Sequence, residues 1–276
     1  MTNKQTARAN TTPALSKQSL EAKVAPKWVE RQALRKWFDD TLSPGHFKDY
    51  CPNGLQIQGA AQVKLIACAV TASLKAIEAA AELGAQALLV HHGYFWRGED
   101  PCLVGIKYQR IQLLLKHNIN LFAFHLPLDV HPTLGNNAQL GARLGWTTDE
   151  RFGDQNLICA TRLNAPIDVT SFAKNLKRHL KHAPLMVGDL TRKVQRIAWC
   201  TGGAQDSLQE AIEAGCDAFV SGEISERTTH LAREAGVVYA AAGHHATERF
   251  GVQALAKAAS EALDLSWCFV DDPNPV

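Results

Sequence analysis

The stretch GHHATERFG, residues 243–251, lies near the end of the 276-residue chain. An apolar run at 237–242 precedes it, and an apolar-periodic segment at 252–263 follows it. This order predicts a strand, a tight turn and a helix, with polar residues at the carboxyl end of the strand, where open α/β sheets bind their ligands. His244 and Glu248, four positions apart, then project to one side of the first helical turn and can bind a transition metal. The alternative is a capped helix in which Thr247 and Glu248 satisfy free N–H groups.

Two further windows place histidines in the same context. The apolar run 87–90 is followed by HHGYFW at 91–96, and the apolar run 120–124 is followed by HLPLDVH at 125–131. Six of the eleven histidines therefore follow one of three predicted strands. Histidines scattered through a core would not repeat one structural context three times, so the pattern favours a metal site over packing or capping.

The alternation of strands and helices over residues 64–124 predicts an α/β fold with mixed, largely parallel sheets. The pattern then recurs at a constant offset of 131 positions: Ile66-Ala67 matches Ile197-Ala198, and Gly84 matches Gly215. A match without gaps across strand, helix, glycine and strand predicts two related lobes with the metal site in the cleft between them. We expect a mobile tail at 1–27, a metal-binding lobe at 28–130 plus 236–276, and a second lobe at 131–235.

The repeat is informative where it breaks. His91 and His92 correspond to Gly222 and Glu223, so the second lobe lacks the histidine pair. One lobe would then bind the metal while the other forms a wall of the site, with Glu223 and Ser225 as candidate substrate contacts. The alternative for these two residues is a solvated loop that caps a helix.

The composition limits the class of protein. Lys and Arg total 29 against 27 Asp and Glu, and a net charge of +2 gives no support to a nucleic-acid or membrane partner. Seven cysteines are scattered without a C-x-x-C pair, which is typical of small buried hydrophobes in a reducing cytoplasm. No apolar stretch is long enough to span a bilayer. The polar residues 1–27 contain no apolar signal core and predict the mobile tail.

The three windows offer more N and O donors than one ion needs, because a catalytic zinc typically takes three protein ligands. The surplus predicts two divalent ions bridged by Glu248, with His91 and His92 on different ions, Asp129 on one of them and His244 on the other. Zinc, iron, manganese, cobalt and nickel all suit such ligands. Three histidines remain as candidates that orient ligands or face the substrate: His125, His131 and His245.

Two ions about 4 Å apart can activate a bridging water and stabilise charge on a phosphoryl or carbonyl oxygen, which predicts metal-assisted hydrolysis. The catalytic group would be the metal-bound water, with His125, His245 and Glu223 as candidate helpers. The sequence contains no P-loop, no dinucleotide fingerprint between strand and helix and no G-x-S-x-G motif, so nucleotide-transfer and acyl-enzyme mechanisms lack their parts.

Five motifs together resemble the family of GTP cyclohydrolase I type 2 homologues, also called NIF-three-like, and above all its short bacterial YbgI-type members. These motifs are PNGLQ at 52–56, VHHGYFW at 90–96, HLPLD at 125–129, GNNAQL at 135–140 and GHHATER at 243–249. The resemblance extends from about Trp28 to the final Pro-Asn-Pro. It implies a two-lobe α/β subunit, a dinuclear metal site between the lobes and a toroidal homohexamer whose sites face an inner cavity. The family's ligands fall on His91, His92, Asp129, His244 and Glu248.

Two functions follow as expectations. The first is a cytoplasmic metal-dependent hydrolase that acts on a nucleotide-like small molecule. The alternative is a non-enzymatic ring scaffold, stabilised by its metals, that binds a protein or nucleic-acid partner. The resemblance does not decide between them, because the family's name rests on a proposed cyclohydrolase activity.

Overall fold

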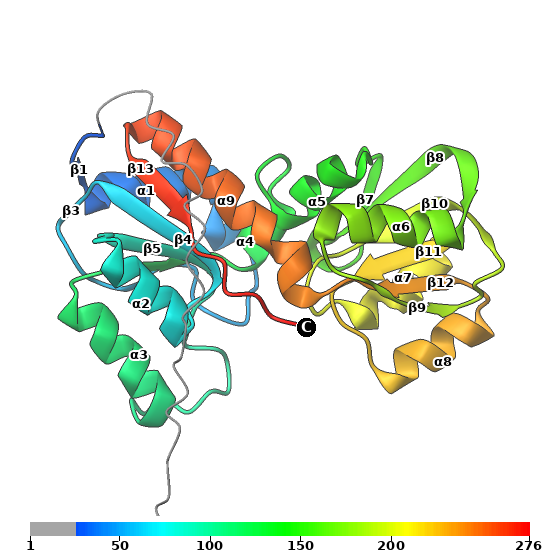
Figure 1. Cartoon of the computed structure of the whole chain (residues 1–276), viewed down its shortest axis with the longest axis horizontal. Coiled ribbons are helices and arrows are strands. Elements are labelled where there is room, and N and C mark those ends of the chain that lie inside the picture. The colour runs from blue at the N-terminus through cyan, green and yellow to red at the C-terminus, as the bar shows by residue number, and fades with distance from the viewer. Residues whose placement is uncertain (1–25) are drawn as a thin grey trace, which may run out of the picture.

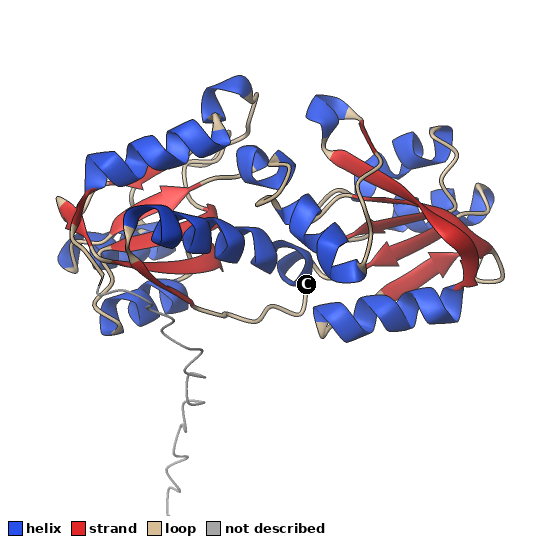
Figure 2. Ribbon diagram, turned by 90° about the horizontal axis from the view of Figure 1, so that it is seen from above, coloured by secondary structure: helices blue, strands red, loops and turns tan. Residues whose placement is uncertain are grey.

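The computed structural model describes residues 26–276, and the tail expected at 1–27 lies outside this part except for its last two residues. The described chain forms one five-stranded sheet, one six-stranded sheet and a two-stranded ribbon. Figure 1 shows the two large sheets side by side, with helix α9 (His244–Leu263) reaching from one to the other. Figure 2 shows helices on both sides of the strands in each half. The predicted α/β fold with mixed sheets is confirmed.

We call the part built on the five-stranded sheet the first lobe; its strand order is β13-β4-β5-β6-β2. Helices α2 and α3 pack on one face of this sheet, and α1 and α9 pack on the other. Successive residues of β4 face opposite sides, so Ala67 packs with α2 and α3 whereas Cys68 packs with α1 and α9. The elements are β1 (Val29–Glu30), α1 (Arg31–Leu42), η1 (Pro44–His46), β2 (Gly54–Ile57), β3 (Gln62–Val63), β4 (Leu65–Thr71), α2 (Leu74–Glu82), β5 (Ala87–His92), α3 (Gly105–Lys116), β6 (Asn120–Ala123), α4 (Leu126–Val130) and β13 (Ser266–Phe269).

We call the part built on the six-stranded sheet the second lobe; its strand order is β7-β8-β10-β11-β12-β9. Helices α5 and α6 pack on one face together with the start of α9, and α7 and α8 pack on the other. The elements are α5 (Asn136–Leu144), β7 (Glu150–Phe152), η2 (Asp154–Asn156), β8 (Ile158–Asp168), α6 (Val169–Leu180), β9 (Leu185–Gly188), β10 (Lys193–Trp199), η3 (Gln205–Ser207), α7 (Leu208–Glu213), β11 (Ala218–Ser221), α8 (Glu226–Glu234) and β12 (Val238–Ala241).

The two lobes share a topology. The order β4-β5-β6-β2 in the first lobe corresponds to β10-β11-β12-β9 in the second, each with three parallel strands and one antiparallel edge strand. β2 starts at residue 54 and β9 at residue 185, which is the offset of 131 positions seen in the sequence. One side-chain contact repeats at the same offset, because Gln86 accepts N–H bonds from residues 64–65 and Asp217 accepts them from residues 195–196. The shared topology supports the predicted relation between the lobes.

Two expectations need correction. Largely parallel pairing holds for the five-stranded sheet, but three of the five strand pairs in the second lobe, β7 with β8, β8 with β10 and β12 with β9, are antiparallel. In addition, β12 pairs with β11 and β9, so the chain does not return to the first lobe at residue 236. The sequence of a strand that is apolar and buried on both faces does not indicate which of two sheets it will join. We therefore propose that the first lobe resumes at Gly243.

Helix α9 belongs to the cores of both lobes. Its first turns place Ala246 and Phe250 against α5 and α6, and its later turns place Val252 and Leu255 against the first sheet. The helix therefore fixes its amino end, where the histidines lie, between the two sheets. Among residues 26–276, no helix has both the length and the apolar character that a membrane span requires.

Candidate metal centre

Strand β5 ends in the two histidines of the first window. Their ring centroids lie 4.5 Å apart, but their exposure differs: the His91 side chain is fully buried, whereas that of His92 is 18% exposed. Asp129 comes from α4, a single helical turn that directly follows β6 and buries the carboxylate. Because β5 and β6 are parallel neighbours, their carboxyl ends bring these three residues to one edge of the sheet.

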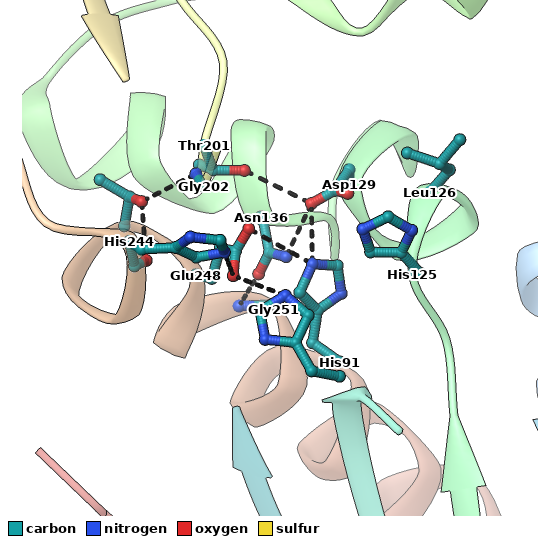
Figure 3. A network of polar contacts seen from close by, with 12 residues as sticks. His91, His125, Leu126, Asp129, Asn136, Thr201, Gly202, His244, Glu248 and Gly251 are labelled. Carbon is teal, nitrogen blue, oxygen red and sulfur yellow. Dashed lines mark hydrogen bonds and ion pairs between the residues drawn. The ribbon is translucent and has the colours of Figure 1, made fainter. Parts of the chain in front are cut away.

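The amino end of α9 supplies the other two predicted ligands. Gly243 precedes the helix with φ +92°, a conformation that favours glycine, and the helix begins at His244. Glu248 follows one turn later and points to the same side as His244 (Figure 3). The capping alternative is wrong for Thr247 and Glu248. The Thr247 hydroxyl accepts the N–H of Gly202 from the second lobe, and the Glu248 carboxylate faces histidines instead of free N–H groups of its own helix.

The carboxylate of Glu248 lies at the centre of the cluster. Its Oε1 is 3.4 Å from His91 Nε2, and its Oε2 is 3.2 Å from His92 Nε2 and 3.1 Å from His244 Nε2. The same His91 Nε2 also lies 3.5 Å from Asp129 Oδ1. Two triads result, and both include Glu248: we call His91, Asp129 and Glu248 the inner triad, and His92, His244 and Glu248 the outer triad. The ligand atoms within each triad lie within 4.8 Å of one another.

Two buried atoms of the cluster lack a hydrogen-bond partner within the described chain, namely His91 Nε2 and Glu248 Oε2. Glu248 Oε2 has two imidazole nitrogens at ion-pair distance, but their orientation is not that of hydrogen bonds. Leaving buried polar atoms unsatisfied costs about 1–3 kcal/mol each, so such atoms call for an explanation. Imidazole nitrogens and carboxylate oxygens directed at shared points are a donor set that fits divalent transition metals.

The electrostatics agree with a site built for cations. Burial lowers the pKa of His91, but the Asp129 and Glu248 carboxylates outweigh burial and raise this pKa to about 10. Burial also opposes the charge of His244, and its contacts with Glu248 and Glu223 nevertheless raise its pKa to about 9. Burial disfavours ionisation of Glu248, yet the surrounding histidines hold the pKa of that carboxyl well below its usual range. The Glu248 carboxylate is therefore ionised, and it attracts positive charge.

The inner triad is oriented by uncharged groups. His91 Nδ1 lies 2.8 Å from the carbonyl oxygen of Phe124, which directs Nε2 to the cluster. Asp129 Oδ1 accepts a hydrogen bond of 2.8 Å from Asn136 Nδ2 and one of 3.4 Å from the Thr201 hydroxyl. Contacts of this kind hold ligands in place and keep their free atoms aimed at the metal position.

The outer triad is more exposed and has different supports. His92 Nδ1 lies 3.1 Å from the Thr71 hydroxyl at the end of β4. His244 Nδ1 lies 2.6 Å from Glu223 Oε1, which comes from the second lobe directly after β11. Glu223, which the sequence offered as a substrate contact, is thus paired with the predicted ligand His244.

The second lobe also approaches the cluster through Gly202. A Cβ at this position would lie 1.9 Å from Glu248 Oε1, and the backbone φ of +70° also favours glycine. The N–H of Gly222 donates to the Gly202 carbonyl at 2.7 Å, which holds the loops after β10 and β11 together. Only a residue without a side chain leaves room here for the carboxylate.

The remaining predicted residues divide into two groups. His125 joins the cluster: its ring nitrogen lies within 4.8 Å of those of His91 and His92. The structure does not bring His131 and His245 to the cluster. His131 Nδ1 accepts N–H bonds from residues 133–134, and His245 Nε2 lies 2.9 Å from Asp271. For Ser225 the capping alternative is right, because its hydroxyl caps α8 by accepting the Thr228 N–H.

Sequence reasoning missed Asp49, which supports His125. His125 Nδ1 lies 2.7 Å from Asp49 Oδ1, and Asp49 Oδ2 accepts hydrogen bonds from Asn53 and from the backbone N–H of Leu126. Burial disfavours ionisation of Asp49, but the bonds from His125 and Asn53 lower its pKa to about 2. The PNGLQ motif contains Asn53 and was a signal that this loop meets the site, but nothing local pointed to the aspartate itself.

Comparisons with known proteins agree with this architecture. The family model described as Duf34/NIF3 (NGG1p interacting factor 3) matches residues 29–275. A protein described as GTP cyclohydrolase 1 type 2 homolog from Neisseria meningitidis serogroup A is 48% identical over 247 residues, which cover 90% of this chain and 99% of the relative. Its counterpart from Escherichia coli K12 is 46% identical over 248 residues, which cover 90% of this chain and 100% of the relative. A solved structure described as protein ybgI, of unknown function, superposes with a TM-score of 0.87 at 44% identity, covering 90% of this chain and 100% of that one.

Proposed function

The chain belongs to the Duf34/NIF3 family, and from this premise we propose that it binds two divalent metal ions and acts as a metal-dependent hydrolase on a nucleotide-like small molecule. The description of its relatives as GTP cyclohydrolase 1 type 2 homologs supports the nucleotide-like substrate class. The proposal for the metals rests on the chain's own residues.

The observation that carries the proposal is the position of Glu248. Its two carboxylate oxygens face different histidines: Oε1 faces His91, and Oε2 faces His92 and His244. A carboxylate can bind one metal through each oxygen, so Glu248 is suited to bridge an ion in the inner triad and an ion in the outer triad. Zinc, iron, manganese, cobalt and nickel all suit this donor set.

Two such ions would supply Lewis acidity towards a phosphoryl or carbonyl oxygen of the substrate. Side chains beside the ions would transfer protons and orient the groups that do so. His125 is the residue that we assign to proton transfer, because it lies beside the inner and outer histidines and is not a member of either triad. Asp49 fixes the orientation of its ring through Nδ1, as a carboxylate partner does for a general base. Trp96 lies edge-on to the same ring, with 5.0 Å between centroids.

We also propose that the protein assembles as a homohexameric ring, as the family resemblance implies, and that it acts in the cytoplasm, as its scattered cysteines suggest. Exposed apolar side chains around α3, among them Val104, Ile106 and Leu115, support a protein contact on that side of the molecule. Light scattering coupled to gel filtration measures the assembly directly, and a monomeric mass at micromolar concentration would contradict the ring.

The test begins with elemental analysis of the native protein, purified without chelator, beside the Glu248→Gln and His91→Ala variants. We expect about two ions per native chain and a sharp loss in both variants, because each variant removes a donor of the inner triad and the first removes the shared donor. Glu261→Gln is the matched control, since it makes the same change on the exposed side of α9. No metal in the native protein, and none recovered on titration, would refute the metal proposal.

The metal-loaded protein is then screened against nucleoside triphosphates, phosphoesters and cyclic amides. We expect turnover by the native protein and the Glu261→Gln control, and none above background by Glu248→Gln. Native protein that binds two ions but turns over no member of the panel would contradict the hydrolase and favour the metal-stabilised scaffold.

A further inference from the structure

The two triads that share Glu248 differ in their surroundings. In the inner triad, His91 is fully buried and Asp129 is nearly so. In the outer triad, the side chains of His92 and His244 are 18% and 27% exposed. An ion in the inner triad would have two carboxylates among its three ligands. An ion in the outer triad would have one, that of Glu248, and would share it with the inner ion.

The hydrogen bonds on the far side of each imidazole differ as well. His91 Nδ1 faces a backbone carbonyl and His92 Nδ1 faces a hydroxyl, and both partners are uncharged. Of the three histidines in the two triads, His244 alone has a carboxylate at Nδ1, Glu223 Oε1 at 2.6 Å. A carboxylate at this place fixes the tautomer that leaves Nε2 free to bind a metal and makes that nitrogen a stronger donor.

Glu223 is held firmly in this position by the second lobe. The hydroxyl of Tyr239, a fully buried residue of β12, donates to the Glu223 backbone carbonyl. The N–H of Gly243 donates to the Gly222 carbonyl at 3.0 Å, which ties the end of β11 to the start of α9. The Glu223 side chain is 35% exposed and has no ion pair within the described chain other than the one with His244.

The repeat gives Glu223 a counterpart that is itself in the cluster. At the offset of 131 positions Glu223 corresponds to His92, and each lies three positions after a matched apolar pair, Leu88-Leu89 in β5 and Phe219-Val220 in β11. The first-lobe residue reaches the cluster directly, whereas the second-lobe residue reaches it through His244. One position of the repeat thus supplies a donor at the end of β5 in the first lobe and, just after β11 in the second lobe, the partner of a donor.

We propose that Glu223 is a positioning residue through which the second lobe sets the metal affinity of the outer triad, so that the inner triad fills first and the outer ion is the exchangeable one. This inference rests on the proposed dinuclear site. It assigns Glu223 to His244 and not to the substrate, and it makes the two metal positions unequal.

The test is a titration of metal-free protein with Co²⁺, followed by the visible absorption of the bound ion and by competition with a chelator. We expect two resolved steps for the native protein. His244→Ala serves as a reference that retains only the inner step. In Glu223→Ala the outer step should weaken about 10- to 100-fold, as is typical for loss of a group that orients a ligand, while the inner step keeps its native affinity. Glu223→Gln retains an acceptor for His244 Nδ1 without the charge. Its affinity for the outer ion should lie between those of the native protein and Glu223→Ala.

Glu226→Gln is the matched control, because it removes a neighbouring carboxylate at the exposed start of α8. Its two steps should equal those of the native protein. Equal outer affinities in native, Glu223→Ala and Glu223→Gln proteins would overturn the inference, as would an equal loss in both steps. If Glu223→Ala does not fold, as judged by circular dichroism before metal is added, the Glu223→Gln comparison decides. A failure of the dinuclear site itself is distinguishable by stoichiometry, because fewer than two ions would then bind per native chain at saturation, whereas two ions bound in one unresolved step would overturn only the inequality of the positions.

Discussion

At the scale of single residues, the cluster depends on how closely two chain segments approach Glu248. The carboxylate has histidines on one side and the backbone of Gly202 on the other, and its Oε1 occupies the space that a side chain at 202 would need. The second lobe therefore helps to position the Glu248 carboxylate because Gly202 has no side chain and leaves room for it. Such a contribution is invisible to any search for ligand residues, although it determines where the bridging carboxylate lies.

The substitution Gly202→Ala should lower metal content and stability together. The added methyl group must displace the Glu248 carboxylate, and an alanine at φ +70° costs more than about 1 kcal/mol of folding free energy. Elemental analysis and urea unfolding measure the two effects. Gly84→Ala, at φ +66° in an open turn with nothing near its Cβ, is the control for backbone strain alone and should retain its metal. Native metal content in Gly202→Ala would contradict the predicted steric role.

The substitution His125→Asn should lower turnover by about 10²- to 10⁴-fold, the usual contribution of a general acid or base. The asparagine amide can still donate to Asp49, so the support of the loop is largely kept. Metal content should stay native because both triads are intact. A variant that loses its metals instead would show that His125 is a ligand and not a proton-transfer residue.

At the scale of elements, one hydrogen-bonding contact repeats in both lobes, with a neutral acceptor in the first lobe and a carboxylate in the second. Gln86 and Asp217 each accept two backbone N–H bonds from the neighbouring parallel strand. Asp217 also forms an ion pair of 2.7 Å with Arg192. Burial disfavours its ionisation, but the bonds from Arg196 and Arg192 outweigh burial and lower the pKa of Asp217 below its ordinary value.

A carboxyl with a lowered pKa in the folded state stabilises the protein above its unfolded pKa, which is about 3.9, and loses this contribution as the pH falls through the folded pKa. The substitution Asp217→Asn should therefore cost about 1–3 kcal/mol at pH 7 and less at a second pH below about 3.9, where the carboxyl is already protonated in the unfolded chain. Urea unfolding at both pH values measures the difference. Gln86→Ala is the uncharged control in the first lobe, and its cost should be the same at both pH values. If Asp217→Asn costs the same free energy of unfolding at both pH values, the charge of Asp217 does not contribute to stability as predicted.

At the scale of the whole molecule, α9 connects the two lobes and carries two of the five predicted ligands. Its first turns pack in the second lobe and its later turns in the first. Metals bound at its amino end would join the last residues of β5 to residues that follow β6 and β12. The metals would thus stabilise the contact between the lobes as well as the site.

Removal of metal should accordingly lower the melting temperature. A ligand that binds only the folded state at 100 times its Kd stabilises that state by about 2.7 kcal/mol. Calorimetry of the native protein before and after dialysis against a chelator measures the loss, and re-addition of metal should restore the original value. The Glu248→Gln variant is the control and should melt at one temperature with or without chelator. A native melting temperature that does not respond to chelator would contradict metal-dependent stability.

The sequence by itself determined the α/β class, the repeat at 131 positions and the three histidine windows, because each depends on local periodicity and on the rule that strands deliver polar residues at their carboxyl ends. The spacing of four positions also placed His244 beside Glu248, but it left the role of His245 open, and only the tertiary structure showed that this side chain contacts Asp271. The sequence also did not show that β12 stays in the second sheet. These features depend on contacts between residues far apart in the chain, and an apolar strand or a glycine carries no local mark of the partner that it will meet. Only the tertiary structure brought Asp49 and Gly202 to the cluster, and only it showed that Glu223, a candidate from the sequence, contacts His244.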